Sequence, residues 1–295
     1  MESSIDKNYI EFILWRFFAK IVQKISFQKI SKLAKILAYI FYYLIPIRKK
    51  IVISNLKKAF PNKTKKDISK IAFMNYINTG TTFMEIMAFQ KMEAEEILKI
   101  GTVSNLELAK EKIENGKGVI LLTAHFSNWE FGALFMGLIL NKQINVLVKK
   151  QRNRFVANWM SEVREKFKNK EISLGVSVRE LYKTLVSGGI VGIVGDQRAK
   201  KDSGVIVKYF KQPTSTFQGF SALGIKNKVP IIVVLGHRLV DGKYHIEIEE
   251  IKYDNLPLAL PEQIRELNQR YMQILENNVV KYPEQWLWMH NIWKY

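Results

Sequence analysis

Short apolar runs alternate with longer helical patterns along the chain after residue 100. Runs rich in apolar and β-branched residues predict strands, which lie at Gly118–Thr123, Ile144–Lys149, Gly189–Gly195, Val205–Phe210, Ile231–Leu235 and Tyr244–Ile251. Apolar positions with a helical period predict helices near 105–115, 130–140, 155–168, 177–187, 216–227 and 262–281. This alternation predicts an α/β fold, with a mostly parallel mixed sheet flanked by helices. Tyr244–Ile251 alternates apolar and charged residues, which is typical of an edge or half-exposed strand.

The first fifty residues have a different pattern, in which polar positions recur every three or four residues. This spacing predicts one basic helical face, formed by Lys20, Lys24, Gln28, Lys32 and Lys35. Aromatic and aliphatic residues such as Trp15, Phe17 and Phe18 accompany it. A basic, aromatic-rich amphipathic helix suits the interface of an anionic membrane. A helix that packs on the protein core and leaves its lysines in water would show the same pattern.

A membrane span is not evident in this segment. A transmembrane helix needs about 20 predominantly apolar residues, and the longest uncharged stretch here, Ile36–Ile47, has 12 residues and contains Pro46. That stretch could span the bilayer or only dip into it. The pattern changes near 45–65, which divides the chain into membrane-associating helices at 1–50 and an α/β domain at 51–295. Further along, Pro61 marks a turn, and the residues after it predict a helix.

The charge balance strengthens this division. The chain has 46 basic and 27 acidic residues, a formal net charge of +19. Residues 1–70 carry 16 of the basic and 4 of the acidic residues, which is more than half of the excess. Such charge predicts an anionic partner. The chain has no cysteine, which excludes disulfides, thiolate metal sites and a thiol nucleophile.

One histidine occupies a position where chemistry is expected. In "GVILLTAHFSNWEFG", His125 follows an apolar strand, at the sheet edge where α/β proteins bind ligands. Glu130 comes five positions later, and its carboxylate could orient the imidazole so that the other ring nitrogen acts as a base. A purely structural interpretation is also available, because Ser127 and Glu130 form an S-x-x-E capping box at a helix start.

Four segments together resemble a known family. They are "NLKKAFPNKT", "HFSNWE", "VGIVGDQRAKKDSGVIVKYFKQPTSTFQG" and "YPEQWLWMHNIWK". In this order, over about 40–294, they resemble the late acyltransferases of lipid A biosynthesis, within the lysophospholipid acyltransferase superfamily. The resemblance implies a glycerol-phosphate-acyltransferase-like fold at the inner membrane, facing the cytoplasm. The acyl donor would be acyl carrier protein or coenzyme A, and the acceptor a lipid A hydroxyl. The family's H-x4-D/E motif falls on His125 and Glu130.

The resemblance also suggests substrate-binding residues. The family usually has an arginine where "VLVKKQRNRF" places Lys150, with Arg152 as the alternative. A lysine and a bidentate arginine are not equivalent toward phosphate. Asp196 matches the family's Asp-Gln or Asp-His pair, Arg198 follows it, and Asn128 lies inside the histidine motif. In "YPEQWLWMHNIWKY", Asn291 and Ile292 replace the two arginines that the family commonly has after this histidine, and the tryptophans are expected in the core or at the membrane interface.

We therefore expect an O-acyltransferase in which His125 deprotonates the acceptor hydroxyl, Glu130 orients His125, and basic residues hold a phosphorylated glycolipid. No metal or other cofactor is expected, because the sequence has no H-E-x-x-H set and no cysteine. The expected partners are acyl carrier protein and anionic lipids, without nucleic acid. Two alternatives remain: an acyltransferase acting on a glycerolipid or a phosphatidylinositol mannoside, and a non-catalytic basic protein that binds membrane or nucleic acid.

Overall fold

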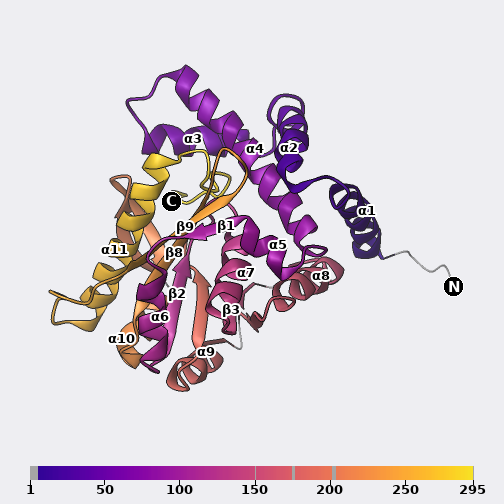
Figure 1. Cartoon of the computed structure of the whole chain (residues 1–295). Coiled ribbons are helices and arrows are strands. Elements are labelled where there is room, and N and C mark those ends of the chain that lie inside the picture. The colour runs from indigo at the N-terminus through magenta and orange to yellow at the C-terminus, as the bar shows by residue number, and fades with distance from the viewer. Residues whose placement is uncertain (1–5, 150, 175–176, 201–203, 295) are drawn as a thin grey trace.

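A seven-stranded mixed sheet forms the centre of the molecule (Figure 1). The structure is a computed structural model that describes residues 6–149, 151–174, 177–200 and 204–294. The strand order is β1-β9-β8-β2-β5-β3-β4, and neighbouring strands are parallel except for the antiparallel pair β8 and β9. The strands are β1 (Gly101–Val103), β2 (Val119–Thr123), β3 (Ile144–Val148), β4 (Lys170–Ser173), β5 (Ile190–Val194), β8 (Ile231–Arg238) and β9 (Tyr244–Glu250). A separate antiparallel hairpin consists of β6 (Gly204–Tyr209) and β7 (Gln212–Phe217).

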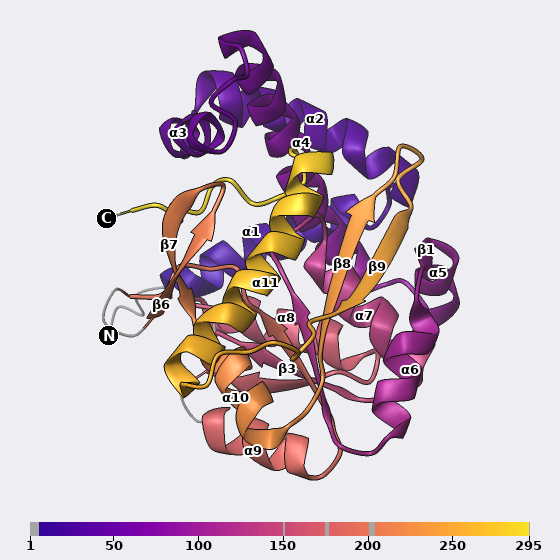
Figure 2. The same ribbon diagram turned by 90° about the vertical axis from the view of Figure 1, so that its left-hand side faces the viewer.

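Helices cover both faces of the sheet (Figure 2). One face carries α5 (Ala94–Lys99), α6 (Leu106–Glu114), α7 (Trp129–Leu140) and α8 (Arg154–Glu165), and the other carries α9 (Ser177–Val186), α10 (Gly219–Asn227) and α11 (Leu260–Lys281). Successive side chains of a strand point to opposite faces. Accordingly, Ile120 and Leu122 of β2 belong to one buried cluster and Val119 and Leu121 to the other. Both faces of the central strand are therefore apolar, as the uninterrupted run in the sequence predicted.

The predicted α/β fold is confirmed, and all six predicted strands are present with ends within two or three residues of the prediction. Three strands lacked a clear sequence pattern. β1 has only three residues, β4 begins with Lys170 and Glu171, and β7 contains Pro213 among polar residues. β9 lies one strand in from the sheet edge, because the short β1 pairs with its outer side.

The N-terminal region consists of consecutive helical segments that precede the long helix α4 (Lys65–Phe89) and pack against it. These segments are α1 (Lys7–Val22), the 3-10 turn η1 (Phe27–Lys29), α2 (Ile30–Tyr39), the π-helical turn η2 (Ile40–Leu44) and α3 (Lys49–Ala59). The Thr64 hydroxyl and the Asp67 carboxylate cap the start of α4 reciprocally. Ala34 of α2 packs against Gly80, where an added Cβ would lie 3.6 Å from the Ala34 methyl. These two small residues let α2 and α4 approach closely.

The regular spacing of lysines does not correspond to one continuous helix. α1 ends at Val22, and α2 begins only at Ile30. The lysines on both sides of this break are exposed, and so is a row of apolar side chains on α1. That row consists of Ile10, Ile13, Leu14, Phe17 and Ile21. A second exposed apolar group, on α2, η2 and the turn after them, consists of Ile36, Tyr39, Tyr43, Leu44, Ile45 and Ile47.

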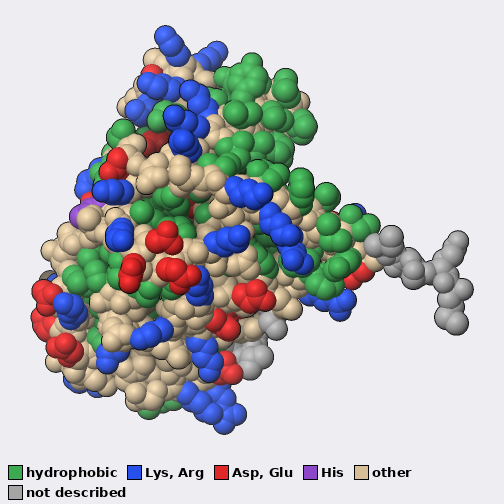
Figure 3. Space-filling model, turned by 45° about the vertical axis from the view of Figure 1, so that its right-hand side comes forward, with side chains coloured by type: hydrophobic (Ala, Val, Ile, Leu, Met, Phe, Trp, Pro, Cys, Tyr) green, Lys and Arg blue, Asp and Glu red, His purple; other side chains and the backbone are tan. Residues whose placement is uncertain are grey.

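Figure 3 shows hydrophobic side chains gathered over the N-terminal helices, with lysine and arginine side chains beside them. Within the described ranges, no single helix is long and apolar enough to cross a membrane. One bent pair, Phe27–Leu44 with Lys49–Ala59, passes the length and composition criteria together, and its two parts meet at 95°.

Candidate active site

Two neighbouring parallel strands bring His125 and Asp196 to the same edge of the sheet. β2 pairs with β5 in register from Val119 opposite Ile190 to Thr123 opposite Val194. His125 follows the end of β2, and Asp196 follows the end of β5. Loops after adjacent parallel strands emerge side by side at the carboxyl edge of the sheet. Gly195 permits tight packing behind Asp196, since an added Cβ there would lie 2.8 Å from the Leu122 side chain.

The Asp196 carboxylate binds His125 twice. One oxygen, Oδ1, lies 2.7 Å from the imidazole Nδ1, and the other, Oδ2, accepts the His125 backbone N–H at 2.9 Å. The Trp286 indole N–H also donates to Oδ2 at 2.8 Å. The Asp196 side chain is only 3% exposed, and that of His125 is 17% exposed. The carboxylate is thus buried with three donors, and the imidazole keeps an open side.

This arrangement shifts both pKa values. Burial alone lowers the pKa of His125, but the charge of Asp196, its hydrogen bond and the charge of Glu130 outweigh burial and raise it above the ordinary value of 6.5. Burial alone raises the pKa of Asp196, but the charge of His125 and the donors from His125 and Trp286 outweigh it and lower that pKa. Asp196 is therefore a carboxylate that stabilises a positive charge on the imidazole.

The imidazole tautomer follows from these partners. A carboxylate only accepts hydrogen bonds, so the Nδ1 atom that faces Asp196 carries the hydrogen. The Nε2 atom then presents a lone pair, and the Gln197 amide nitrogen lies 3.2 Å from it. The Trp129 ring packs edge-on against the imidazole, with 4.7 Å between the ring centroids. His125 therefore has the orientation of a general base, with its basic nitrogen on the exposed side.

Glu130 does not make the contact that the motif suggested. Arg164 of α8 donates to both Glu130 oxygens, from Nε at 2.8 Å and from Nη2 at 2.5 Å. The same guanidinium binds Glu171 at 2.6 Å. In the described part of the chain, the group that orients His125 is Asp196, and Glu130 acts on the imidazole only through its charge. Our expectation of a Glu130–His125 hydrogen bond is thereby corrected.

The start of α7 also differs from the expected capping box. The N-cap residue is Asn128, whose side-chain oxygen accepts the Phe131 backbone N–H at 3.0 Å. Ser127 precedes it with a φ of 52°, and its hydroxyl is buried without a hydrogen-bond partner in the described structure. Asn128 is 1% exposed, and its amide donates to Glu85. Expected to bind substrate, Asn128 instead holds the loop and the helix together.

A distant segment completes the loop that carries His125. Phe126 and Trp286 form an isolated antiparallel bridge. The His125 carbonyl accepts the Leu287 N–H at 3.0 Å, and the Ser127 N–H donates to the Gln285 carbonyl at 2.6 Å. Trp286 is 1% exposed. The prediction that tryptophans of this segment pack in the core is confirmed for Trp286, which in addition binds Asp196.

A large cavity of about 1600 Å³ opens beside His125. Its lining includes Glu130, Arg164 and Trp129 together with many apolar side chains. The apolar lining includes Trp15, Met136, Ile144, Val146, Met160 and Leu181. Drug-sized ligands occupy pockets of about 300–1,000 Å³. A cavity of this size and lining suits a long apolar chain, with its reacting end at His125.

The expected substrate-binding cations lie around this cavity with one exception. Arg152 and Arg198 line it, while Lys150 lies outside the described residues. The Arg198 guanidinium donates to the Lys294 carbonyl at 2.8 Å, and its backbone N–H donates to His290 Nε2 at 3.1 Å. Asp196 was expected to bind substrate, but within the described residues its carboxylate accepts hydrogen bonds from His125 and Trp286.

The other histidines have different surroundings. His290 lines the cavity, and its burial, partly offset by the charge of Asp196, lowers its pKa. His237 stacks on Tyr282 with 4.3 Å between centroids, and His245 shares a hydrogen bond with Thr102. These contacts are typical of structural side chains.

Comparison with known proteins identifies the family. The model of the bacterial lipid A biosynthesis acyltransferase family matches residues 2–295. The chain belongs to this family. It is 22% identical to the lipid A biosynthesis lauroyltransferase of Escherichia coli K12 over 84% of this chain and 79% of that protein. It is 21% identical, over the same shares, to the palmitoleoyltransferase of that strain and to a lipid A biosynthesis acyltransferase of Shigella flexneri. The chain is thus an acyltransferase.

Several site residues of this acyltransferase could not be recognised from the sequence alone. Arg164 sits in an ordinary amphipathic helix, and Trp286 could only be placed in the core or at an interface. The order of the strands is what joins His125 to Asp196, because only adjacent strands bring their loops together. The repeated sequence "apolar strand, then a polar residue" in both places was the available hint.

Proposed function

We propose that this acyltransferase moves a fatty acyl chain from an acyl carrier protein or coenzyme A thioester to a hydroxyl of a lipid A precursor. The observation that carries the proposal is the His125–Asp196 pair, whose His125 lines a large and mostly apolar cavity. The family match and the names of the relatives support the acceptor class. We further propose that the enzyme lies on the cytoplasmic face of the inner membrane. The exposed apolar rows of the N-terminal helices support contact with a membrane.

In the mechanism, His125 Nε2 accepts the proton of the acceptor hydroxyl as the oxygen attacks the thioester carbonyl. The acceptor hydroxyl takes the place of the Gln197 amide, which lies 3.2 Å from Nε2. Asp196 keeps the proton on Nδ1 and stabilises the imidazolium that forms. The imidazolium then gives its proton to the departing thiolate, so the thioester C–S bond breaks and the new ester forms without a covalent enzyme intermediate.

The charges around the imidazole assist this proton transfer. Glu130 and Asp196 both favour the protonated ring, and Arg164 holds the Glu130 carboxylate in place. The apolar side chains of the cavity hold the acyl chain, and Arg152 and Arg198, which also line the cavity, bind the anionic acceptor. Lys150, which the family resemblance suggested, stays a prediction.

The basic surface supports an anionic donor and an anionic membrane. A formal charge of +19 attracts both an acidic carrier protein and anionic headgroups. We expect no metal or other cofactor, since a hydroxyl acceptor and a thioester donor require only proton transfer.

The test combines lipid analysis with a mechanism variant. Mass spectrometry of lipid A from cells with and without the active protein should reveal one added acyl chain, and its mass reports chain length and acceptor together. The purified His125→Ala variant should lose acyl transfer and thioester hydrolysis by about 10²–10⁴-fold, as expected for loss of a general base. Near-normal transfer by a folded His125→Ala variant would contradict the mechanism. An added chain on a glycerolipid instead would contradict the acceptor and retain the mechanism.

A further inference from the structure

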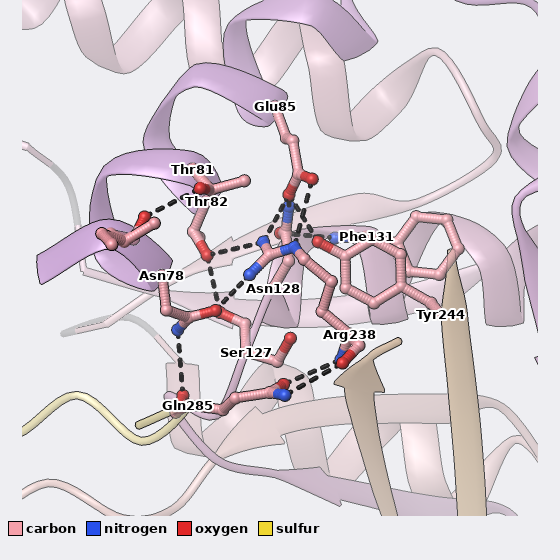
Figure 4. A network of polar contacts seen from close by, with 11 residues as sticks. Asn78, Thr81, Thr82, Glu85, Ser127, Asn128, Phe131, Arg238, Tyr244 and Gln285 are labelled. Atoms are coloured by element: carbon pink, nitrogen blue, oxygen red, sulfur yellow. Dashed lines mark hydrogen bonds and ion pairs between the residues drawn. The ribbon is translucent and has the colours of Figure 1, made fainter. Parts of the chain in front are cut away.

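A buried network of polar side chains contacts Ser127 and Asn128 of the His125 loop (Figure 4). None of the residues labelled in this figure lines the cavity. Its centre is the ion pair of Glu85 on α4 and Arg238 at the end of β8, with 2.6 Å between Oε2 and Nη2. Their side chains are 2% and 10% exposed. The Tyr244 hydroxyl also donates to Glu85, and the Tyr244 ring stacks on Phe131 of α7 with 4.3 Å between centroids.

Three contacts connect this pair to the loop. The Asn128 amide donates to Glu85 Oε2 at 2.9 Å, which ties the N-cap of α7 to α4. The Thr82 hydroxyl donates to the Ser127 carbonyl at 2.8 Å and accepts from Arg238 Nη2 at 3.2 Å. The His125 loop and the start of α7 are thereby held by Thr82 and Glu85, which do not line the cavity.

The same arginine also fixes the segment that carries Trp286. The Arg238 backbone N–H donates to the Gln285 side chain at 2.8 Å, and the Gln285 amide donates back to the Arg238 carbonyl at 2.9 Å. Gln285 accepts the Ser127 N–H through its own carbonyl. Arg238 also donates to Asn78, which contacts that carbonyl at 3.3 Å. The His125 loop therefore has a support on each side, Asp196 on one and this network on the other.

Stability alone does not explain such a pair. Burial of two charges costs solvation free energy, and apolar residues of similar volume are often equally stable or more stable. What a charged pair offers is a set of directional contacts, in which each carboxylate oxygen and each guanidinium N–H has a fixed direction. Ser127 has a φ of 52°, a backbone conformation that a serine adopts only when its surroundings hold it.

We propose that Glu85 and Arg238 are positioning residues for acyl transfer, which hold Ser127 and Asn128 so that His125 stays in contact with Asp196. The inference rests on the proposed function, since the geometry that it protects is that of the general base. Neither residue touches the reacting atoms. Their loss lets the loop drift, and a drift of about 1 Å at a catalytic group can cost about 10²-fold in rate.

The primary test compares Glu85→Gln, Arg238→Met and Arg238→Lys in the full-length enzyme. We expect Glu85→Gln and Arg238→Met to lower kcat about 10- to 100-fold, with the KM of the acyl thioester changed less than about threefold. Arg238→Lys, which keeps the charge, should recover part of the loss. The matched control is Glu250→Gln, which breaks the Lys112–Glu250 pair in a different part of the fold and should leave kcat unchanged.

A second readout does not depend on turnover. The chain has four histidines, so selective histidine labelling and NMR titration can follow His125, assigned by the His125→Gln spectrum. The charged and titratable groups that act on His125 are Asp196 and Glu130, with His290 nearby. In Glu85→Gln, the pKa of His125 should fall toward its ordinary value as the contact with Asp196 loosens, while Glu250→Gln should leave it unchanged.

The outcomes distinguish a positioning role of Glu85 and Arg238 from a purely structural role. If folded Glu85→Gln and Arg238→Met keep wild-type kcat and the wild-type His125 titration, and lose only unfolding free energy, the positioning role is wrong. If either variant does not fold, Thr82→Val serves instead, because it removes a single hydroxyl, which donates to Ser127 and accepts from Arg238. It should lower kcat several-fold, and unchanged kcat would overturn the proposal.

If the wild-type enzyme transfers no acyl group while the titration still shifts in Glu85→Gln, the proposed function fails and the positioning of His125 stands.

Discussion

Arg164 holds Glu130 through both carboxylate oxygens and keeps this acidic residue of the H-x4-E motif away from the His125 imidazole. The same guanidinium also binds Glu171, so a single cation serves two carboxylates. All three side chains are largely buried, with exposed fractions of 13% for Arg164, 10% for Glu130 and 15% for Glu171. The motif's carboxylate thus acts on His125 as a nearby charge, and its fixed position depends on a helix 34 residues further along the chain.

This arrangement predicts that Arg164→Met lowers the free energy of unfolding more than Glu130→Gln does. Arg164→Met leaves two buried carboxylates without their cation, and we expect a loss of about 3–5 kcal/mol in the free energy of unfolding. Glu130→Gln leaves Arg164 paired with Glu171 and should cost about 1–3 kcal/mol. Chemical denaturation of both variants gives the comparison. Equal losses would show that Glu171 does not support Arg164 when Glu130 is neutral.

Loss of the Asp196 charge should reduce catalysis with little change in side-chain volume. In Asp196→Asn the amide no longer fixes the hydrogen on Nδ1, so the imidazole can present the wrong nitrogen to the acceptor. We expect kcat to fall by about 10²–10⁴-fold, as for loss of the aspartate in a serine protease triad. Steady-state kinetics with an acyl thioester measures the change. Glu249→Gln, at an exposed position on β9, is the control and should retain activity.

The pH dependence of kcat/KM provides a separate check on the same pair. A general base must be neutral to accept a proton, and the pKa of His125 is raised above 6.5. The rate should therefore begin to fall at a pH above 6.5 as the pH is lowered, because His125 becomes protonated there. In Asp196→Asn, burial dominates and lowers the pKa, so the residual activity should persist to a lower pH. An acid limb at the same pH in both enzymes would indicate that another group titrates.

The cavity wall predicts how acyl chain length could be changed. Gly132 of α7 lines the cavity, and a Cβ added there meets no atom within 4 Å apart from its chain neighbours and the nearby backbone of its own helix. Gly132→Leu should fill part of the cavity without disturbing the helix. We expect kcat/KM for the longest accepted chain to fall about tenfold or more, with shorter chains retained. Gly132→Ala is the control, and assays across a series of acyl thioesters test both. A uniform loss for all chain lengths would show that the acyl chain lies elsewhere.

The apolar row on α1 predicts membrane binding that can be weakened by point substitution. Leu14 and Phe17 are 64% and 65% exposed, so Leu14→Glu and Phe17→Glu change the surface without opening the core. Insertion of one such side chain contributes about 1.5–3 kcal/mol. Each variant should therefore bind anionic liposomes at least about tenfold more weakly in co-sedimentation. Leu258→Glu, at a fully exposed position before α11, should bind like the wild type. Equal loss in this control would point to a non-specific charge effect.

The sequence predicted the sheet well because buried parallel strands are continuous apolar runs, as in β2 and β5. It also placed His125 and Asp196 at strand ends. It did not predict their partnership, since strand order depends on packing between elements far apart in the chain. The local pattern around Glu130 predicted that its carboxylate forms a capping box with Ser127 or contacts His125. In the structure the carboxylate instead pairs with Arg164, which belongs to another helix. Short polar strands such as β7 were missed because their side chains bury little apolar surface.

The segment around Trp286 places a condition on how the enzyme becomes active during synthesis. Asp196 and Trp286 are 90 positions apart, yet the indole N–H is one of three donors to the buried carboxylate. A nascent chain that has emerged from the ribosome only as far as α11 already contains His125 and Asp196, but it lacks Trp286 and the backbone contacts of residues 285–287 with the His125 loop. The buried carboxylate of such a chain has two of its three donors. The full set of contacts around His125 and Asp196 therefore forms only after residues 285–287 have been translated and have docked.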